Sequence, residues 1–244
     1  MSRKLKVFQI AICTASILLC RQPASAQPPQ QTPATEEAHH HGNDRHDGKV
    51  LLLPRDLELR LAVNALPPSL REEATLFALD PNGYVKVKQG GNPFTCMVSR
   101  RGDSLYPVCF DEEGARTIMP VYIDDAVLRL KGTPAEEVDR QMAAGFESGR
   151  YRPPSRPGIA YMLSPAAYLR DSSGKLARSI PHVMFYAPYL TDRDIGGAIG
   201  KSAFVDRPGP HGRIIVAAGQ AERERALTNS QALVDELEHQ IGLK

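Results

Sequence analysis

The spacing of apolar residues predicts a group of strands early in the chain. Residues 74–79 form an apolar run, and residues 84–88 (YVKVK) alternate between apolar and polar, which is typical of a half-buried strand. Runs rich in aromatic and β-branched residues follow at 94–100 and 105–110, and Gly, Pro, Asn and Asp separate the runs as turn residues. Together these segments predict a four-strand antiparallel meander over about 74–110.

Helical spacing dominates the middle and the end of the chain. Residues 121–131 place Ile123, Val127 and Leu130 on one stripe, and residues 133–136 (TPAE) have the form of a capping box that begins a second helix reaching Gly149. Residues 221–241 predict a C-terminal amphipathic helix, while 159–163, 183–187 and 214–218 read as buried strands. The expected class is α+β with an antiparallel or mixed sheet, two central helices and a C-terminal helix.

The two cysteines of the later sequence fit one hairpin register. If Gly102-Asp103 forms a two-residue turn, counting outward from it places Cys96 opposite Cys109 on a non-hydrogen-bonded pair, where a disulfide is possible. Pro107 also falls on such a pair, so its missing N–H points away from the hairpin partner. A missing donor on that side predicts that residues 105–110 form an edge strand there. We therefore expect a Cys96–Cys109 disulfide; two free buried cysteines are the alternative.

The first 26 residues have the three parts of a secretory signal peptide. Arg3, Lys4 and Lys6 precede an apolar stretch over 7–20, and Ala24-Ser25-Ala26 is a small-residue cleavage site. The stretch is short for a membrane span, which needs about 20 apolar residues, and we expect no transmembrane span after signal removal. The protein is expected to be exported, periplasmic or extracellular, with lipid anchoring at Cys20 as a minor alternative.

Composition after processing argues against a nucleic-acid partner. The signal segment holds four basic residues and no acidic one, so its removal changes 30 basic and 28 acidic residues into 26 and 28. Nucleic-acid-binding domains are usually strongly basic. Residues 27–48 lack large aliphatic and aromatic side chains and predict a disordered linker rich in Pro, Gln and His, followed by a single globular domain over 49–244.

Histidines provide the candidate chemistry. His39, His40, His41 and His46 lie in the linker and form a candidate weak metal-binding tract, because imidazole is a ligand for divalent metals; a solvated spacer is the alternative. In the domain, His182 opens one predicted strand and His211 precedes another. If these strands are parallel neighbours, the two rings meet at one end of the sheet and form a candidate ligand or metal site; antiparallel neighbours would separate them.

No catalytic or cofactor motif decides the function. The sequence has no G-x-S-x-G or H-E-x-x-H segment, so the catalytic residues and the cofactor are unknown, with a divalent metal as one option. We expect a non-catalytic domain of the cell envelope that binds a small molecule, metal or partner. The alternatives are a metal-dependent or His-assisted hydrolase centred on His182 and His211, and a structural interaction protein. A pocket with both histidines would favour the enzyme, and an apolar patch on a shallow surface would favour interaction.

Overall fold

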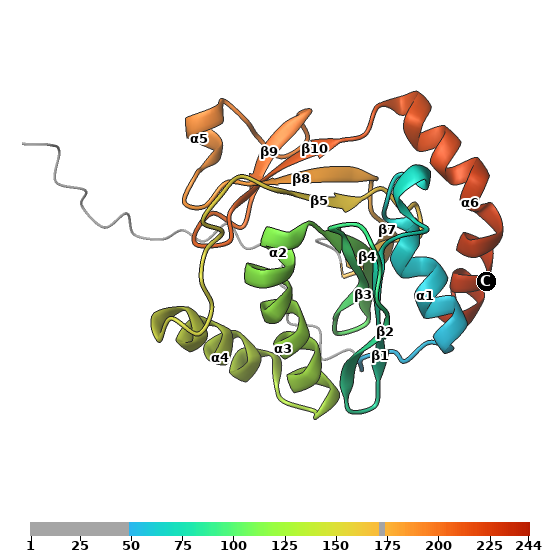
Figure 1. Ribbon diagram of the computed structural model, residues 1–244, viewed down its shortest axis with the longest axis horizontal. Helices are drawn as coiled ribbons and strands as arrows, with labels where there is room; N and C mark the ends of the chain where they lie inside the picture. Colours follow the sequence, from blue (N-terminus) through green and yellow to red (C-terminus); the bar gives the residue numbers. More distant parts are fainter. Residues whose placement is uncertain (1–48, 171–173) are drawn as a thin grey trace, which may run out of the picture. The chain divides into compact units, whose positions relative to one another are not determined.

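The computed structural model describes residues 49–170 and 174–244, so the predicted signal peptide, the linker and Cys20 lie outside the described residues. Helices and strands are mixed along the chain (Figure 1). The helices are α1 (Arg55–Asn64), α2 (Glu112–Thr117), α3 (Met119–Leu130), α4 (Ala135–Glu147), α5 (Asp192–Ile195) and α6 (Gln220–Gln240), with a 3₁₀ turn at Pro68–Leu70. The strands are β1 (Thr75–Asp80), β2 (Gly83–Lys88), β3 (Thr95–Arg101), β4 (Ser104–Phe110), β5 (Ile159–Met162), β6 (Tyr168–Arg170), β7 (Leu176–Arg178), β8 (His182–Tyr186), β9 (Ala203–Asp206) and β10 (Arg213–Ala217).

One mixed sheet contains all these strands, which confirms the predicted α+β class. Its main path runs β2-β1-β3-β4-β5-β8-β10-β9, and β6 and β7 branch from β4. The four strands predicted over about 74–110 are present, but their order differs from a meander because β1 lies between β2 and β3 and pairs with β3 in parallel. The loop after β2 folds back along β1, where Asn92 N–H donates to the Glu73 carbonyl and Gly90 N–H to Thr75 Oγ1. Alternation of apolar and polar residues predicts that a segment forms a strand, but it does not show which strand lies beside it in the sheet.

The β3–β4 hairpin follows the predicted register. Arg101 pairs with Ser104 around a turn in which Gly102 has a φ of 62°, and Cys96 pairs with Cys109. The Cys96–Cys109 disulfide is therefore confirmed, with the two Cα atoms 4.0 Å apart. The predicted edge at Pro107 is wrong, because β4 lies inside the sheet. On that side β4 pairs with β6 at Leu105 and with β5 from Cys109, so Pro107 lies between two separate partners and opposes neither.

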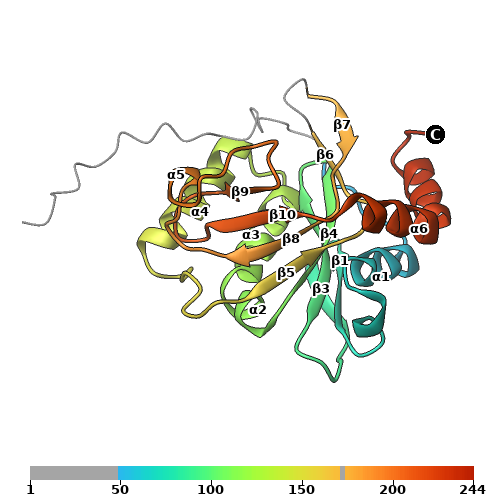
Figure 2. The same cartoon turned by 90° about the horizontal axis from the view of Figure 1, so that it is seen from above.

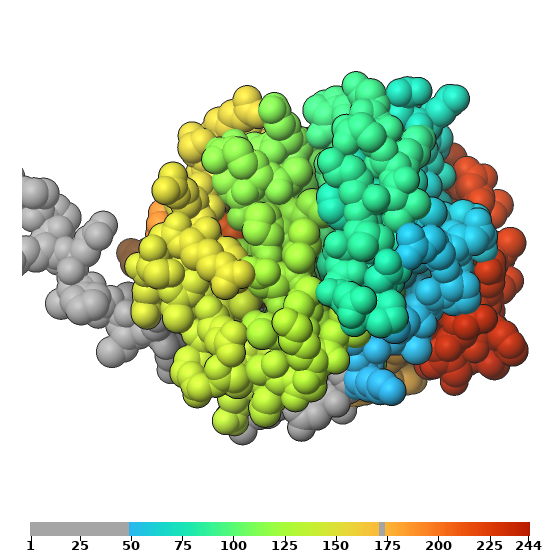
Figure 3. All heavy atoms as spheres, turned by 60° about the horizontal axis from the view of Figure 1, so that its bottom comes forward, coloured from blue at the N-terminus to red at the C-terminus, as the bar shows by residue number. Residues whose placement is uncertain are grey.

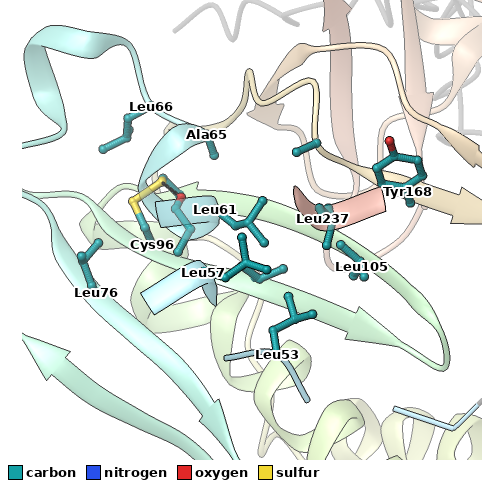
Figure 4. Packing of buried hydrophobic residues seen from close by; sticks show 14 of the residues in the cluster. Leu53, Leu57, Leu61, Ala65, Leu66, Leu76, Cys96, Leu105, Tyr168 and Leu237 are labelled. Atoms are coloured by element: carbon teal, nitrogen blue, oxygen red, sulfur yellow. Dashed lines mark hydrogen bonds between the residues drawn. A yellow bond between two sulfur atoms is a disulfide. The ribbon is translucent and has the colours of Figure 1, made fainter. Parts of the chain in front are cut away.

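Helix α1 covers one face of the sheet over β1, β3 and β4. Its apolar residues recur at helical spacing and pack on the disulfide and on neighbouring strands (Figure 4). The predicted C-terminal helix is present as α6 and packs outside α1, where Val234 and Leu237 join the same core. The buried side chains that Figure 4 labels are Leu53, Leu57, Leu61, Ala65, Leu66, Leu76, Cys96, Leu105, Tyr168 and Leu237.

A buried ion pair fixes the position of α1 on β3. Arg100 Nη2 donates to Glu58 Oε2 at 2.5 Å, and both side chains are almost completely buried. The remaining donors of the guanidinium group reach the carbonyls of Leu51 and Val98, at 3.0 and 2.8 Å. Burial raises the pKa of Glu58 although Arg100 opposes the shift. Removing one member of such a pair leaves a buried polar group without its partner.

Helices α2 and α3 cover the opposite face and build a second core with the same sheet. Met97, Phe110, Met184 and Ile215 come from strands along its whole width, and Ile118 closes the core from the helical side. Helix α3 confirms the predicted helix near 121–131. The sequence did not reveal the short helix α2, which Asp111 begins by accepting from Gly114 N–H at 2.8 Å.

Helix α4 packs on α3 through the predicted stripe, but it begins differently from the prediction. Val138 and Met142 join Tyr151 in a small third core, with Phe146 packed against it. The residue before the first helical turn is Pro134, and no side chain caps the helix, so the predicted capping box of Thr133 does not form. Proline fixes the entry φ of the chain, and the helix starts one residue later at Ala135.

Candidate interaction surface

The two histidines proposed as a site lie at opposite ends of a strand pair. Strands β8 and β10 are antiparallel neighbours, in which His182 pairs with Ala217 and Tyr186 pairs with Arg213. His211 comes two residues before Arg213, so its ring lies at the far end from His182. The structure therefore does not bring them together, and the condition for a shared catalytic or metal site is not met.

Each of these histidines has a local structural role. His182 Nδ1 lies 2.7 Å from the Ile180 carbonyl oxygen. His211 Nε2 lies 3.1 Å from the Arg152 carbonyl oxygen, and its ring meets the Phe146 ring edge to face with centroids 4.7 Å apart. Burial lowers the pKa of both imidazoles, that of His211 to about 4. Both rings are therefore neutral at pH 7 and anchor adjacent loops.

The predicted metal tract lies outside the described residues, because His39, His40, His41 and His46 precede residue 49. Within residues 49–170 and 174–244, no group of three or more His, Cys, Asp or Glu side chains is arranged to hold a metal ion.

Two hollows in the described part of the surface are lined by residues other than His182 and His211. A shallow groove of about 420 Å³ lies where the first described residues meet the β1–β2 turn and the end of α3, a side of the molecule that Figure 3 shows. Its lining is Lys49, Val50, Leu51, Leu52, Pro81, Arg129 and Leu130. A smaller cavity of about 40 Å³ lies between β4, α3 and the residue after β9.

The largest departure from ordinary sheet construction is a set of apolar side chains on β5, β8 and β10. The register aligns Ile159, Phe185 and Ile214 in one row across the three strands. A second row, two residues along each strand, holds Tyr161, Val183 and Val216. Residues two apart share a face of a strand, so both rows point to the same side, opposite Met184 and Ile215 of the second core. We call these six residues the open face.

The open face meets solvent where the adjoining part of the sheet is covered by α1. Phe185 is 45% exposed and Val216 is 36% exposed, although both lie within the sheet. In Figure 2 strands β5, β8 and β10 face the viewer while α3 lies behind them and α6 lies to one side. In the described part of the chain, no helix packs on this side of β8 and β10. Tyr161 forms the border, because its ring packs edge to face on Phe94 with centroids 5.5 Å apart.

The composition of the open face is unusual for a surface that meets only water. Antiparallel strands with one solvated face usually alternate apolar inward and polar outward residues. Strand β8 instead reads His-Val-Met-Phe-Tyr, and β10 carries Ile214 and Val216 outward between inward-pointing residues. None of the six residues is charged, and two are aromatic. Depletion of charge and enrichment in aromatic residues characterise the centres of protein interfaces.

The sequence signal for this surface was present but ambiguous. Continuous apolar runs at 159–163, 183–187 and 214–218 predicted strands buried on both faces, and the structure has strands at these places. A strand is buried on both sides only if each face of its sheet is covered by another layer. The apolar pattern of one strand does not show whether a helix covers each face. The neighbouring edge strand β9 was not predicted, because its four residues lie within a long Gly- and Pro-rich connection.

Comparison with known proteins identifies no relative of this chain. No protein-family model matches the sequence, and neither curated proteins nor solved structures show a significant similarity to the chain. Among the described helices, none is long and apolar enough to cross a membrane.

Proposed function

We propose that the protein is an exported, non-catalytic domain that binds a partner protein through the open face. The observation that carries this proposal is the pair of uncharged rows on β5, β8 and β10, with Phe185 45% exposed at their centre. The partner presents a complementary apolar surface, such as one face of a helix or sheet. The proposal includes the envelope location expected from the signal sequence, with which the Cys96–Cys109 disulfide is compatible.

Phe185 and its neighbours leave apolar area in water that a partner would bury on binding. Burying apolar surface is favourable by about 25 cal/mol per Å², and aromatic anchors at the centre of an interface often carry much of the binding energy. The sheet also supplies a rigid backbone, so binding does not require a loop to become ordered. A shallow apolar surface without a deep pocket suits a macromolecular partner better than a small substrate.

Site-specific photo-crosslinking tests the proposal in cells that produce the protein naturally. A photoreactive phenylalanine analogue replaces Phe185 in one variant and Val87 in a matched control; Val87 lies on edge strand β2 and is 39% exposed. The proposal predicts one discrete covalent adduct of higher mass from position 185 and no such adduct from position 87. Absence of a discrete adduct at position 185, or the same adduct from both positions, would contradict it.

A further inference from the structure

The open face is continuous with the interface between α1 and the sheet. Its second row ends at Tyr161, which pairs on its other side with Cys109 of β4. Cys109 is completely buried in the core that α1 covers. Directly after β5, the Leu163 N–H donates to the carbonyl of Ala65 at the end of α1, at 3.1 Å. The end of α1 therefore marks one side of the open face.

The other side of the open face ends at a sheet edge that is already occupied. Strand β9 is the last strand of the path, and Val205 continues the first row onto it. The Val205 N–H donates to Asp192 Oδ1 of α5 at 2.6 Å, so it points away from β10. A Cβ atom added at Gly197 would lie 2.9 Å from the Ala203 carbonyl oxygen, so the loop after α5 lies against the same edge. A partner strand therefore cannot pair with β9 without displacing this segment, and a partner must lie on the face.

The width of the open face fits one helix. Neighbouring strands lie about 4.8 Å apart, so β5, β8 and β10 together are about 14 Å wide. A helix with its side chains is about 10–12 Å across, whereas a second sheet of four strands would be about 19 Å wide and would meet α1. The same face of the sheet contains an example of this match, because α1 covers the three strands β1, β3 and β4.

The length and chemistry of the open face define the helix further. Strand β8 has five residues and extends about 16 Å, which is the length of about eleven helical residues. Helix α1 has ten residues. None of the six residues of the open face is charged, so a charged side chain pointing into it would be buried without a partner. The matching helix therefore carries uncharged apolar residues at i, i+3 or i+4 and i+7, with polar residues on its other side.

We propose that the open face binds one amphipathic helix of the partner protein, about three turns long, which lies beside α1 and along β8. This inference rests on the proposed function and names the part of the partner that covers Phe185. In the complex, the helix extends the layer that α1 begins, so that β5, β8 and β10 are covered as β1, β3 and β4 already are.

Mapping of photo-crosslinks from two positions of β8 tests the helix in cells that produce the protein naturally. A diazirine analogue of leucine, which reacts with atoms in contact, replaces Phe185 in one variant and Val183 in another. These two positions share a face and lie about 6.6 Å apart, close to the rise of four helical residues. A third variant carries the analogue at Val216, which is 36% exposed, so the test does not depend on the folding of the Val183 variant. Val87 on β2 is again the matched control.

The adducts from positions 185, 183 and 216 are expected to map by mass spectrometry to one partner segment of about eleven residues. The modified residues should be three or four apart, and position 87 should give none. Modified residues two apart, or on separate segments of the partner, would overturn the helix but not the partner surface. An adduct to residues 27–48 of the chain itself, or to a second copy of the chain, would identify a different occupant and also overturn the helix. Absence of a discrete adduct at position 185 would remove the proposed function, and the helix with it.

Discussion

Two halves of one face of the sheet both carry apolar side chains, but these side chains lie in different surroundings. Over β1, β3 and β4, helix α1 buries the outward side chains, and α6 packs outside it. Over β5, β8 and β10, the outward side chains form the open face, where Phe185 meets solvent. The first half even buries the Glu58–Arg100 ion pair, while the second half leaves aromatic surface in water. An apolar strand can therefore be buried by a helix of its own chain or by another protein. We propose the second case for β5, β8 and β10.

The largest effect on stability is expected at the covered half. Leu61 is completely buried beneath α1 and packs in the first core. Leu61→Ala should destabilise the protein by roughly 2–5 kcal/mol, because the truncation leaves a cavity. Urea unfolding followed by circular dichroism measures this loss. A loss below about 1 kcal/mol would mean that α1 is not the effective cover that we describe.

The disulfide contributes the next effect, also in the covered half. Replacing both Cys96 and Cys109 by alanine should cost about 2–4 kcal/mol, since the bridge restricts the unfolded chain. Thermal unfolding of the double variant beside the oxidised parent checks the value. The parent protein treated with reductant is the control and should lose a similar amount; an unchanged midpoint in both would contradict the expectation.

The stability of the protein should fall in acid because His211 is buried. The pKa of His211 is lowered to about 4 by burial, whereas an unfolded histidine has a pKa near 6.5. The unfolded state binds more protons between these values, so stability is lost as pH falls from about 6.5 to about 4, by roughly 3 kcal/mol. His211→Asn should flatten this part of the pH profile in urea titrations. Exposed His239→Gln should keep the slope of the parent protein, and a parent-like slope in His211→Asn would refute the assignment.

The smallest effect on stability is expected on the open face. Phe185→Thr places a β-branched residue with good strand propensity at this position, and the side chain of Phe185 is already 45% exposed. Its unfolding free energy should stay within about 0.5–1 kcal/mol of the parent value, although the adduct or complex formed in cells should be lost. A loss comparable to that of Leu61→Ala would show that Phe185 belongs to the core of the domain itself.

Much of the fold was predictable because local rules determine it. Turn chemistry at Gly102 and strand alternation predicted the pairing of Cys96 with Cys109, and helical spacing located α3, α4 and α6. The parallel pairing of β1 with β3 was not predictable, because it depends on the loop at Gly90 folding back along Thr75. The edge strand predicted at Pro107 is not an edge, because the neighbouring strand on that side is divided into β5 and β6.

The candidate site was less predictable than the fold. His182 and His211 suggested a shared site only for parallel strands, and strand direction is a tertiary property. Phe185 and Val216 lay within runs that the sequence predicted to be buried. They are exposed because α1 packs on β1, β3 and β4 and does not reach β8 and β10. The residue spacing within β8 or β10 does not show how far α1 extends.

The most direct test of the open face is hydroxyl-radical footprinting of Phe185 in intact producing cells and in the purified protein. Leu52, which is 40% exposed at the groove beside α3, serves as the reference side chain. Our account predicts ready oxidation of Phe185 in the purified protein and strong protection in cells, with Leu52 oxidised similarly in both. Equal oxidation of Phe185 in the two settings would contradict the proposal that a partner covers this face.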